Sequence, residues 1–253
     1  GSGATISSLG FIPFVKNYDR VLYPSEPPKK REVVDQIQIF AAQGEKEPFV
    51  VGVYPLGQEK GVAGMDVFDL VDGAGNRIAA DAVKVRYVQY KLKVGSSNIY
   101  TARGELLREG NKAILKPGMV RYFWVTVDVP KEAVPGVYKG KVSVRVGETV
   151  KDFEVSLNVL PFELASLDIP VGLFYELPPQ FNWYEELQDQ RWTEIERQLQ
   201  DMRDHGMNTM ALSIAPEVKA VHDTGDVEMG FKFFDDFLHA YKHFGFNQPV
   251  SGY

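Results

Sequence analysis

The sequence contains no cysteine and only four histidines in 253 residues. Without cysteine there are no disulfides, thiolate metal sites or cysteine nucleophiles. No apolar run reaches the roughly 18 residues that a membrane-spanning helix needs, so we predict no membrane span. The net charge of -6 gives no reason to expect a nucleic-acid partner, because such binding needs clustered lysine and arginine. Nucleic acid and membrane-spanning functions are therefore not expected.

The cellular location stays open on the residues alone. The first three residues, Gly1-Ser2-Gly3, are typical of what an expression tag leaves behind. Their presence is compatible with the removal of a native signal peptide, so the lack of one in this sequence does not indicate the cellular location. The absence of disulfides does not decide the matter, since exported bacterial enzymes often have none.

Apolar residues recur at period two from about residue 33 to 159, between turns rich in glycine and proline. The clearest strand is 142–146, in which three valines alternate with polar residues. Roughly eight strands fit this stretch, given where the turn residues fall. We therefore predict an antiparallel β-sandwich over 33–164, preceded by a lead-in segment, 1–32.

The period changes after this region. A stripe of apolar residues spaced three and four apart predicts a helix over about 192–205, and a second helix follows over about 233–244. Short apolar runs at 171–175 and 209–214 flank the first helix, and another apolar residue, Val250, follows the second. The predicted order of elements is β-α-β-α-β.

Strands that alternate with helices in this way imply right-handed crossovers and a parallel sheet, as in a barrel. A complete eight-unit barrel needs about 250 residues, and only 165–253 is left for it here. The predicted fold class is therefore multidomain β plus α/β: the sandwich, then the first βα units of a (β/α)8 TIM-type barrel, truncated. Because such a fragment leaves a strand edge and an apolar face uncovered, we expect possible self-association through the incomplete barrel.

Six stretches of the chain, taken in order, carry a family resemblance. They are AQGEKEPF at 42–49, VRYVQY at 85–90, RYFWVTVDVP at 121–130, PGVYKG at 135–140, LPFEL at 160–164 and DMRDHGMNT at 201–209. Together they resemble the N-terminal domain and barrel entrance of family-123 glycoside hydrolases and of the related proteins known as domain of unknown function 4091.

The resemblance implies a β-N-acetylgalactosaminidase-like enzyme that acts on N-acetylhexosaminides and retains configuration by substrate assistance. In that family an Asp orients the 2-acetamido group and the adjacent Glu is the general acid and base, and this pair is expected beyond residue 253. We therefore assign no catalytic residue, no cofactor and no metal, and expect the chain alone to be inactive. The implied partner of the full-length protein is a glycan, and a secreted, periplasmic or cell-surface location is favoured. The alternative is a non-catalytic cell-surface module that binds carbohydrate or protein.

Four residues are candidates for substrate binding. Tyr175 and Glu176 end the first predicted barrel strand, and barrel enzymes build their sites at the C-terminal ends of strands. A carboxylate and an aromatic ring suit a sugar, although Glu176 has the alternative of an ion pair with a neighbouring loop. Trp183 and Glu217 lie in the loops after the first and second strands, where the same argument applies with less force.

Other chemistry-bearing groups are better explained by structure. The acidic pair Asp235-Asp236 opens a predicted helix, where negative charge is favourable. His239 and His243 are four residues apart on that helix but lack a third ligand. The aromatic run around Trp124 has a role either in stacking on a sugar or in the core, and a strand apolar on both sides favours the core.

Overall fold

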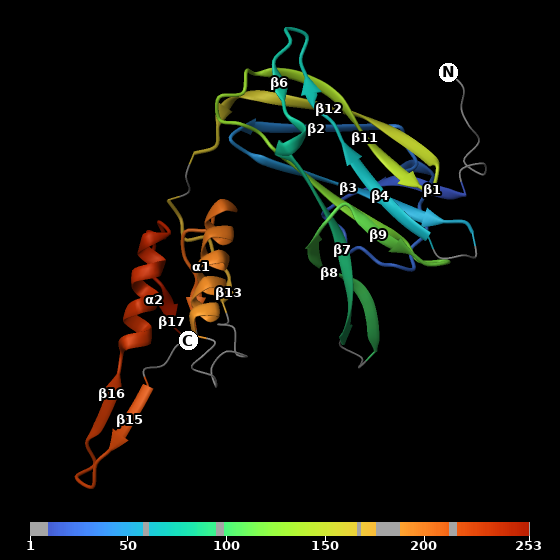
Figure 1. Cartoon of the computed structure of the whole chain (residues 1–253). Helices are drawn as coiled ribbons and strands as arrows, with labels where there is room; N and C mark the ends of the chain where they lie inside the picture. The colour runs from blue at the N-terminus through green and yellow to red at the C-terminus, as the bar shows by residue number, and fades with distance from the viewer. Residues whose placement is uncertain are drawn as a thin grey trace. The chain divides into compact units, whose positions relative to one another are not determined.

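The chain folds into two compact units, Gly1–Leu164 and Ala165–Tyr253 (Figure 1). The structure is a computed structural model that describes residues 10–57, 61–94, 99–165, 168–175, 188–212 and 217–252. Each unit has a hydrophobic core of its own.

Two β-sheets make up the first unit. In spatial order, one sheet contains β1 (Phe11–Lys16), β3 (Lys46–Pro55), β10 (Arg121–Asp128), β7 (Val83–Val94) and β8 (Tyr100–Glu109). The other contains β2 (Gln36–Gln43), β12 (Thr149–Glu163), β11 (Gly136–Val146), β4 (Gly61–Val67) and β9 (Lys112–Leu115). The short strand β5 (Leu70–Val71) also pairs with β11, and β6 (Arg77–Ile78) pairs with β5. The described part of this unit has no α-helix, only the 3-10 turns η2 (Lys30–Glu32) and η3 (Ala80–Ala82).

Alternation along the strands explains how the two sheets pack. On β10, Phe123 and Val125 are fully buried in the main core, which draws residues from both sheets. Tyr122 and Trp124 belong to a smaller cluster on the opposite face of their sheet. Successive side chains of a strand point to opposite faces, so β10 contributes to both clusters. The predicted N-terminal β domain is confirmed.

The prediction that every pair of strands is antiparallel is wrong in one place. Strand β2 runs parallel to β12, with Ile37 opposite Val155 and Ala41 opposite Val159. The chain leaves β2 for β3, which lies in the other sheet, so β2 has no hairpin partner and pairs with a strand distant in sequence. Strand β1 is also new, because it lies within the segment to which the sequence assigned no fold.

The described residues of the second unit form three short parallel strands, two helices and a hairpin. The strands β13 (Phe174–Tyr175), β14 (Ala211–Leu212) and β17 (Ser251–Gly252) lie side by side in that order. They alternate with α1 (Gln188–Asp204) and α2 (Lys232–His243), so the predicted order β-α-β-α-β is present. The described residues show this three-stranded sheet and no closed barrel. A hairpin of β15 (Glu217–Val221) and β16 (Val227–Gly230), which the sequence did not predict, lies between β14 and α2.

Both helices bury their apolar side chains in one cluster with the parallel strands. Ile195 and Leu199 of α1 and Phe237 of α2 are completely buried there. Each helix is followed by a glycine with positive φ, Gly206 at 82° and Gly245 at 82°, which ends a helix without steric cost. The spacing of apolar residues therefore located both helices correctly to within a few residues.

The side chain of Asn208 links two backbone segments of the parallel sheet by hydrogen bonds. Its side-chain oxygen accepts a hydrogen bond from the backbone N–H of Val171 at 2.7 Å, and its Nδ2 donates to the carbonyl of Ile169 at 2.9 Å. The side chain is buried, so it satisfies backbone groups that water does not reach. This residue aligns the segment before β13 with the segment before β14.

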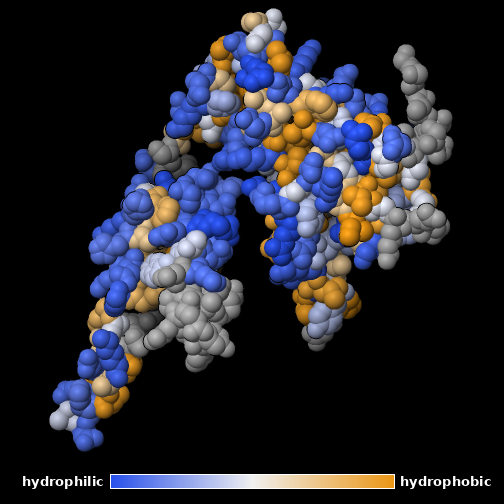
Figure 2. Space-filling model, viewed as in Figure 1, coloured by the Kyte–Doolittle hydropathy of each residue, from blue (hydrophilic) through white to orange (hydrophobic). Residues whose placement is uncertain are grey.

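The hairpin β7–β8 extends beyond the rest of the first unit (Figure 1). Leu92 and Tyr100, near its far end, are 68% and 67% exposed, and this end is coloured as apolar surface in Figure 2. In the part of the chain that the structure describes, neither helix is long and apolar enough to span a membrane.

Candidate functional site

The first candidate site is the end of strand β13, where Tyr175 lies. Its ring is buried and stacks on Phe237 with centroids 6.3 Å apart. Its hydroxyl donates a hydrogen bond to Oε1 of Gln198 on α1 at 2.7 Å. Burial, reinforced by the charge of Glu194, raises the pKa of Tyr175 to about 12. The side chain thus faces the helices, and its hydroxyl is a neutral donor at ordinary pH.

Phe174 occupies the opposite face of the same strand and was not among the predicted residues. It is 73% exposed, and Leu173 before it is 41% exposed. They line a cavity of about 190 Å³ with Pro170, Gly172, Thr209, Met210 and Ala211. Successive side chains of a strand point to opposite faces, so Phe174 lies on the face of this sheet opposite to that of the buried Tyr175.

The remaining predicted residues are placed only in part. Glu176 and Trp183 lie outside the described residues. The backbone of Glu217 pairs with Gly230 at the start of the unpredicted hairpin, so Glu217 lies on a strand rather than in a loop. The structure therefore does not bring the four predicted substrate-binding residues together into one described site, and their role stays a prediction.

A polar network on α1 surrounds the hydroxyl of Tyr175. Gln198, which accepts that hydroxyl, donates through Nε2 to Glu194 at 2.5 Å, and Arg197 donates to both carboxylate oxygens of Glu194 at 2.7 and 2.9 Å. The hydrogen bonds from Arg197 hold the pKa of Glu194 below its ordinary value. The network therefore fixes Tyr175 against α1 and keeps a carboxylate charged beside it.

Arg191 is a buried cation at the beginning of α1. Its guanidinium lies over the ring of Phe233, 4.2 Å from the centroid, and burial lowers its pKa. Its Nε atom is buried, and no acceptor for it exists within the described residues. No group of three or more metal-ligating side chains occurs among those residues either, and His239 points its Nδ1 to the carbonyl of Asp235 at 2.8 Å.

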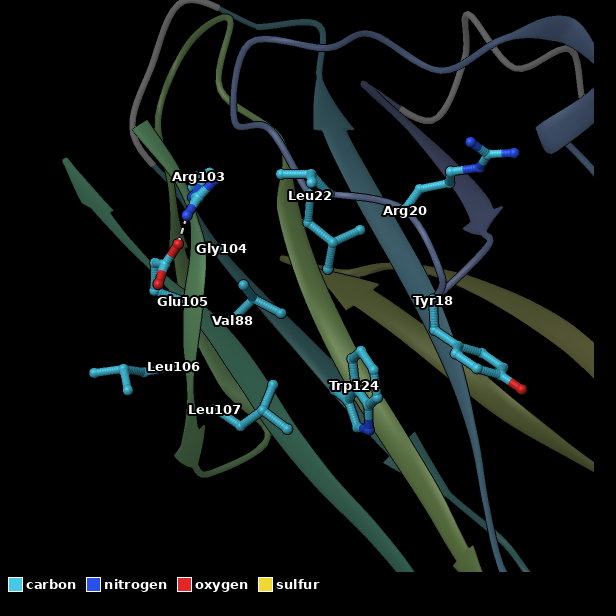
Figure 3. A pocket seen from close by; sticks show the side chains of 11 residues that line it. Tyr18, Arg20, Leu22, Val88, Arg103, Gly104, Glu105, Leu106, Leu107 and Trp124 are labelled. Atoms are coloured by element: carbon cyan, nitrogen blue, oxygen red, sulfur yellow. Dashed lines mark hydrogen bonds and ion pairs between the residues drawn. The ribbon is translucent and has the colours of Figure 1, made fainter. Parts of the chain in front are cut away.

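The second candidate site is a pocket of about 440 Å³ on the outer face of the first sheet, in the first unit (Figure 3). One wall is the segment 17–24, and the floor is formed by strands β7, β8 and β10. The residues that line it are Tyr18, Arg20, Val21, Leu22, Val88, Arg103, Gly104, Glu105, Leu106, Leu107 and Trp124.

Trp124 lies between Leu107 and Tyr18 in the close-up view (Figure 3). The ring of Tyr18 meets it edge to face, with centroids 6.1 Å apart and an angle of 61° between the planes. The sequence favoured a core role for this aromatic run. That interpretation suits Tyr122 and Phe123, which are completely buried, whereas Trp124 is only partly buried and lines the pocket.

The segment 17–24 is held on the sheet by the backbone. Gly104 donates its N–H to the carbonyl of Leu22 at 2.8 Å, and Val120 donates to the carbonyl of Pro24 at 2.8 Å. A β-carbon added at Gly104 would lie 2.6 Å from Cγ1 of Val88 and 3.3 Å from Cβ of Leu22. Glycine at this position is therefore what allows the segment to approach the strands and form the wall.

A β domain followed by a small parallel α/β unit is the class of protein that these elements define. Within that class, the family described as the glycoside hydrolase 123 N-terminal domain matches residues 19–146, about half of the chain. The chain belongs to this glycoside hydrolase family, which confirms the resemblance carried by the six sequence stretches.

One solved structure shares the fold over nearly the whole chain. A family 123 glycoside hydrolase from Clostridium perfringens, studied for glycolipid glycan hydrolysis, is similar over 94% of this chain with a TM-score of 0.77 and 14% identity. This chain spans only 46% of that structure. A PapD-like domain of human CEP192 matches 51% of the chain and 83% of its own length at 13% identity, with a TM-score of 0.33, too low to support an argument. No curated protein matches the sequence.

Proposed function

We propose that the chain is the N-terminal part of a glycoside hydrolase that acts on N-acetylhexosaminides. The observation that carries the proposal is the family match over 19–146, together with the similarity of 94% of the chain to less than half of a family 123 enzyme. The β-N-acetylgalactosaminidase-like activity and the substrate-assisted mechanism come from the family resemblance. In this proposal the substrate of the whole protein is a glycan.

In the same proposal, the three-stranded unit is the opening of a (β/α)8 barrel, with 1–32 and 33–164 forming the lead-in and the sandwich and 165–253 the first barrel units. The support is that β13, β14 and β17 are parallel, adjacent and in chain order, with a helix between each pair. Consecutive strands that pair in this way are the repeating unit of a barrel. The catalytic Asp-Glu pair is then expected further along the barrel, beyond residue 253.

Among the residues proposed to contact the sugar, Glu176, Trp183 and Glu217 are kept on their sequence positions alone. Tyr175 is the weakest of the four, because its hydroxyl is already bonded to Gln198. Phe174 joins the proposal, since an exposed aromatic ring on the face away from the helices is suited to stack on a sugar ring.

The test is hydrolysis of p-nitrophenyl β-N-acetylgalactosaminide and the corresponding glucosaminide. We expect no turnover by residues 1–253 and turnover by a longer protein that continues the βα alternation. Turnover by residues 1–253 that Glu176→Gln abolishes would show that the catalytic groups are within this chain. A longer protein that binds these sugars without hydrolysing them would instead favour a binding module.

A further inference from the structure

We propose that the pocket beneath segment 17–24 is a second carbohydrate-binding site, which takes one pyranose ring on the sandwich, apart from any site in the barrel. The choice of a sugar as ligand rests in part on the function proposed above. The argument for the pocket itself rests on its walls, its aromatic rings and its polar groups.

The pocket has the size and composition of a ligand site. Its volume of about 440 Å³ lies in the range of roughly 300–1,000 Å³ that small-molecule pockets occupy. Such sites are mostly apolar, with a few polar groups that fix the orientation of the ligand. Here Leu22, Val88 and Leu107 provide apolar walls. The charged groups of the lining are Arg20 and the ion pair of Arg103 and Glu105.

The wall formed by segment 17–24 is preformed, because hydrogen bonds within the protein hold it in place. Three hydrogen bonds hold the segment 17–24 on the sheet: the two backbone bonds to Leu22 and Pro24, and a bond from the hydroxyl of Tyr122 to the carbonyl of Tyr23 at 3.3 Å. Tyr122 is completely buried, so this anchor is part of the core. A preformed wall favours binding because little conformational freedom is lost when the ligand enters.

The aromatic groups are those that a pyranose recognises. A pyranose has a face of C–H bonds that packs on an aromatic ring, and hydroxyl groups at its rim that need donors and acceptors. Trp124 offers a large ring together with an N–H donor, and its Nε1 makes no hydrogen bond within the described part of the chain. Tyr18, set edge to face against it, is 45% exposed.

The polar groups of the pocket include both a hydrogen-bond acceptor and hydrogen-bond donors, as the hydroxyl groups of a sugar require. Glu105 is bonded to Nε of Arg103 at 2.5 Å and lies 3.3 Å from Nζ of Lys93. These bonds hold the pKa of Glu105 below its ordinary value, so it stays an acceptor, while Arg103 has further N–H groups to donate. Paired donors and acceptors suit hydroxyls, whereas an acyl chain would leave both unused.

The probes are the methyl β-glycosides of N-acetylgalactosamine, N-acetylglucosamine, galactose and glucose, with octanoate as a purely apolar probe. Saturation-transfer NMR on residues 1–253 is expected to show millimolar binding of at least one glycoside. Tyr18→Ala and Trp124→Ala should each weaken it by about five-fold, the loss expected for one aromatic contact. Tyr18→Ala keeps the test valid if Trp124→Ala disturbs the fold, because Tyr18 is largely at the surface.

Phe40→Ala is the matched control, since Phe40 is 67% exposed on strand β2 of the other sheet. The proposal is wrong if none of the four glycosides binds, if binding is the same in Tyr18→Ala and Trp124→Ala as in the unchanged chain, or if only octanoate binding depends on Trp124. Hydrolysis by the longer protein separates this result from the proposed function. Failure to hydrolyse refutes the enzyme, whereas loss of binding in Trp124→Ala with turnover retained establishes a separate site.

Discussion

Gly172 is the position where one methyl group should disrupt the second unit. A β-carbon at this residue would lie 2.0 Å from the carbonyl oxygen and 2.6 Å from the carbonyl carbon of Thr209, both backbone atoms of the segment before β14. Ordinary contacts between such atoms are about 3.5 Å, so Gly172→Ala requires the two segments to separate by more than about 1 Å. The hydrogen bonds from Asn208 and Thr209 to the carbonyl of Val171 resist that movement.

The expected loss of stability is about 1–3 kcal/mol, the usual range for overpacking, and the backbone contact places it near the upper end. A loss of 1 kcal/mol lowers the midpoint temperature of a unit of this size by about 4–8 °C. Thermal unfolding is followed by fluorescence of Trp192 in the second unit and of Trp124 in the first, each as the single tryptophan of its variant. Only the Trp192 transition should move.

Gly73→Ala is the control for Gly172→Ala, because no atom lies within 4 Å of an added β-carbon there and its φ is not positive. It should leave both transitions unchanged. A Gly172→Ala protein whose Trp192 transition is unaltered would mean that the close approach of the two segments is not what holds this sheet together.

Three further predictions test the units separately. Phe237→Ala and Phe123→Ala remove completely buried rings from different cores, so each should destabilise only its own unit by about 3–5 kcal/mol, read by the same two tryptophans. The pKa of Tyr175 is about 12 in the folded unit and about 10 in the unfolded chain. The stability that this difference contributes is therefore complete below pH 10 and is lost as the pH rises toward 12. Tyr175→Phe should reduce this alkaline loss of stability, which urea unfolding of the second unit measures. The expected self-association should appear in sedimentation as a dimer that Phe174→Ser weakens, while Phe40→Ser does not; a monomer at high concentration would contradict it.

Hydrophobic period explains why most of the fold was predictable. A strand with one buried face needs an apolar residue at every second position, and a helix that covers a sheet needs one at every third or fourth. The first rule located β11 and β12, and the second located α1 and α2 to within a few residues. Both rules describe which face is buried, and neither describes which neighbour buries it.

That limit accounts for the differences. Strands β1 and β2 have proline-rich sequence between them and do not pair with each other. The partner of β1 is β3, which follows β2 in the chain, and the partner of β2 is β12, which is distant in sequence. The exposed hairpin β15–β16 buries little, so it has no apolar period to detect: Val221 and Val227, at its turn end, are 69% and 50% exposed. Pairing that depends on distant strands or on backbone bonds alone leaves little trace in the pattern of apolar residues.

Each candidate site depends on the parity of a strand, that is, on which of its alternate residues point to which face of the sheet. A strand of two residues is too short for the sequence to show this. The sequence located the end of β13 correctly but offered no way to decide whether residue 174 or 175 faces the helices, since both are aromatic. Only the contacts of Tyr175 with Phe237 and Gln198 decide it. Strand β10 is long enough for alternation to show that Trp124 and Phe123 lie on opposite faces, and the two residues belong to different clusters.

Trp124 shows what remains undetermined even when parity is known. Its face of the sheet carries a buried cluster around Tyr122, and the pocket adjoins that cluster and shares Leu22 and Val88 with it; the path of segment 17–24 across the strands forms the wall of the pocket. That path depends on Gly104, some 80 residues away in sequence, where the missing side chain admits the backbone of Leu22. A glycine inside a strand is a recognised sign that another chain segment approaches closely. The sequence analysis drew no inference from Gly104, because a glycine within β8 becomes informative only once the segment that approaches it is known.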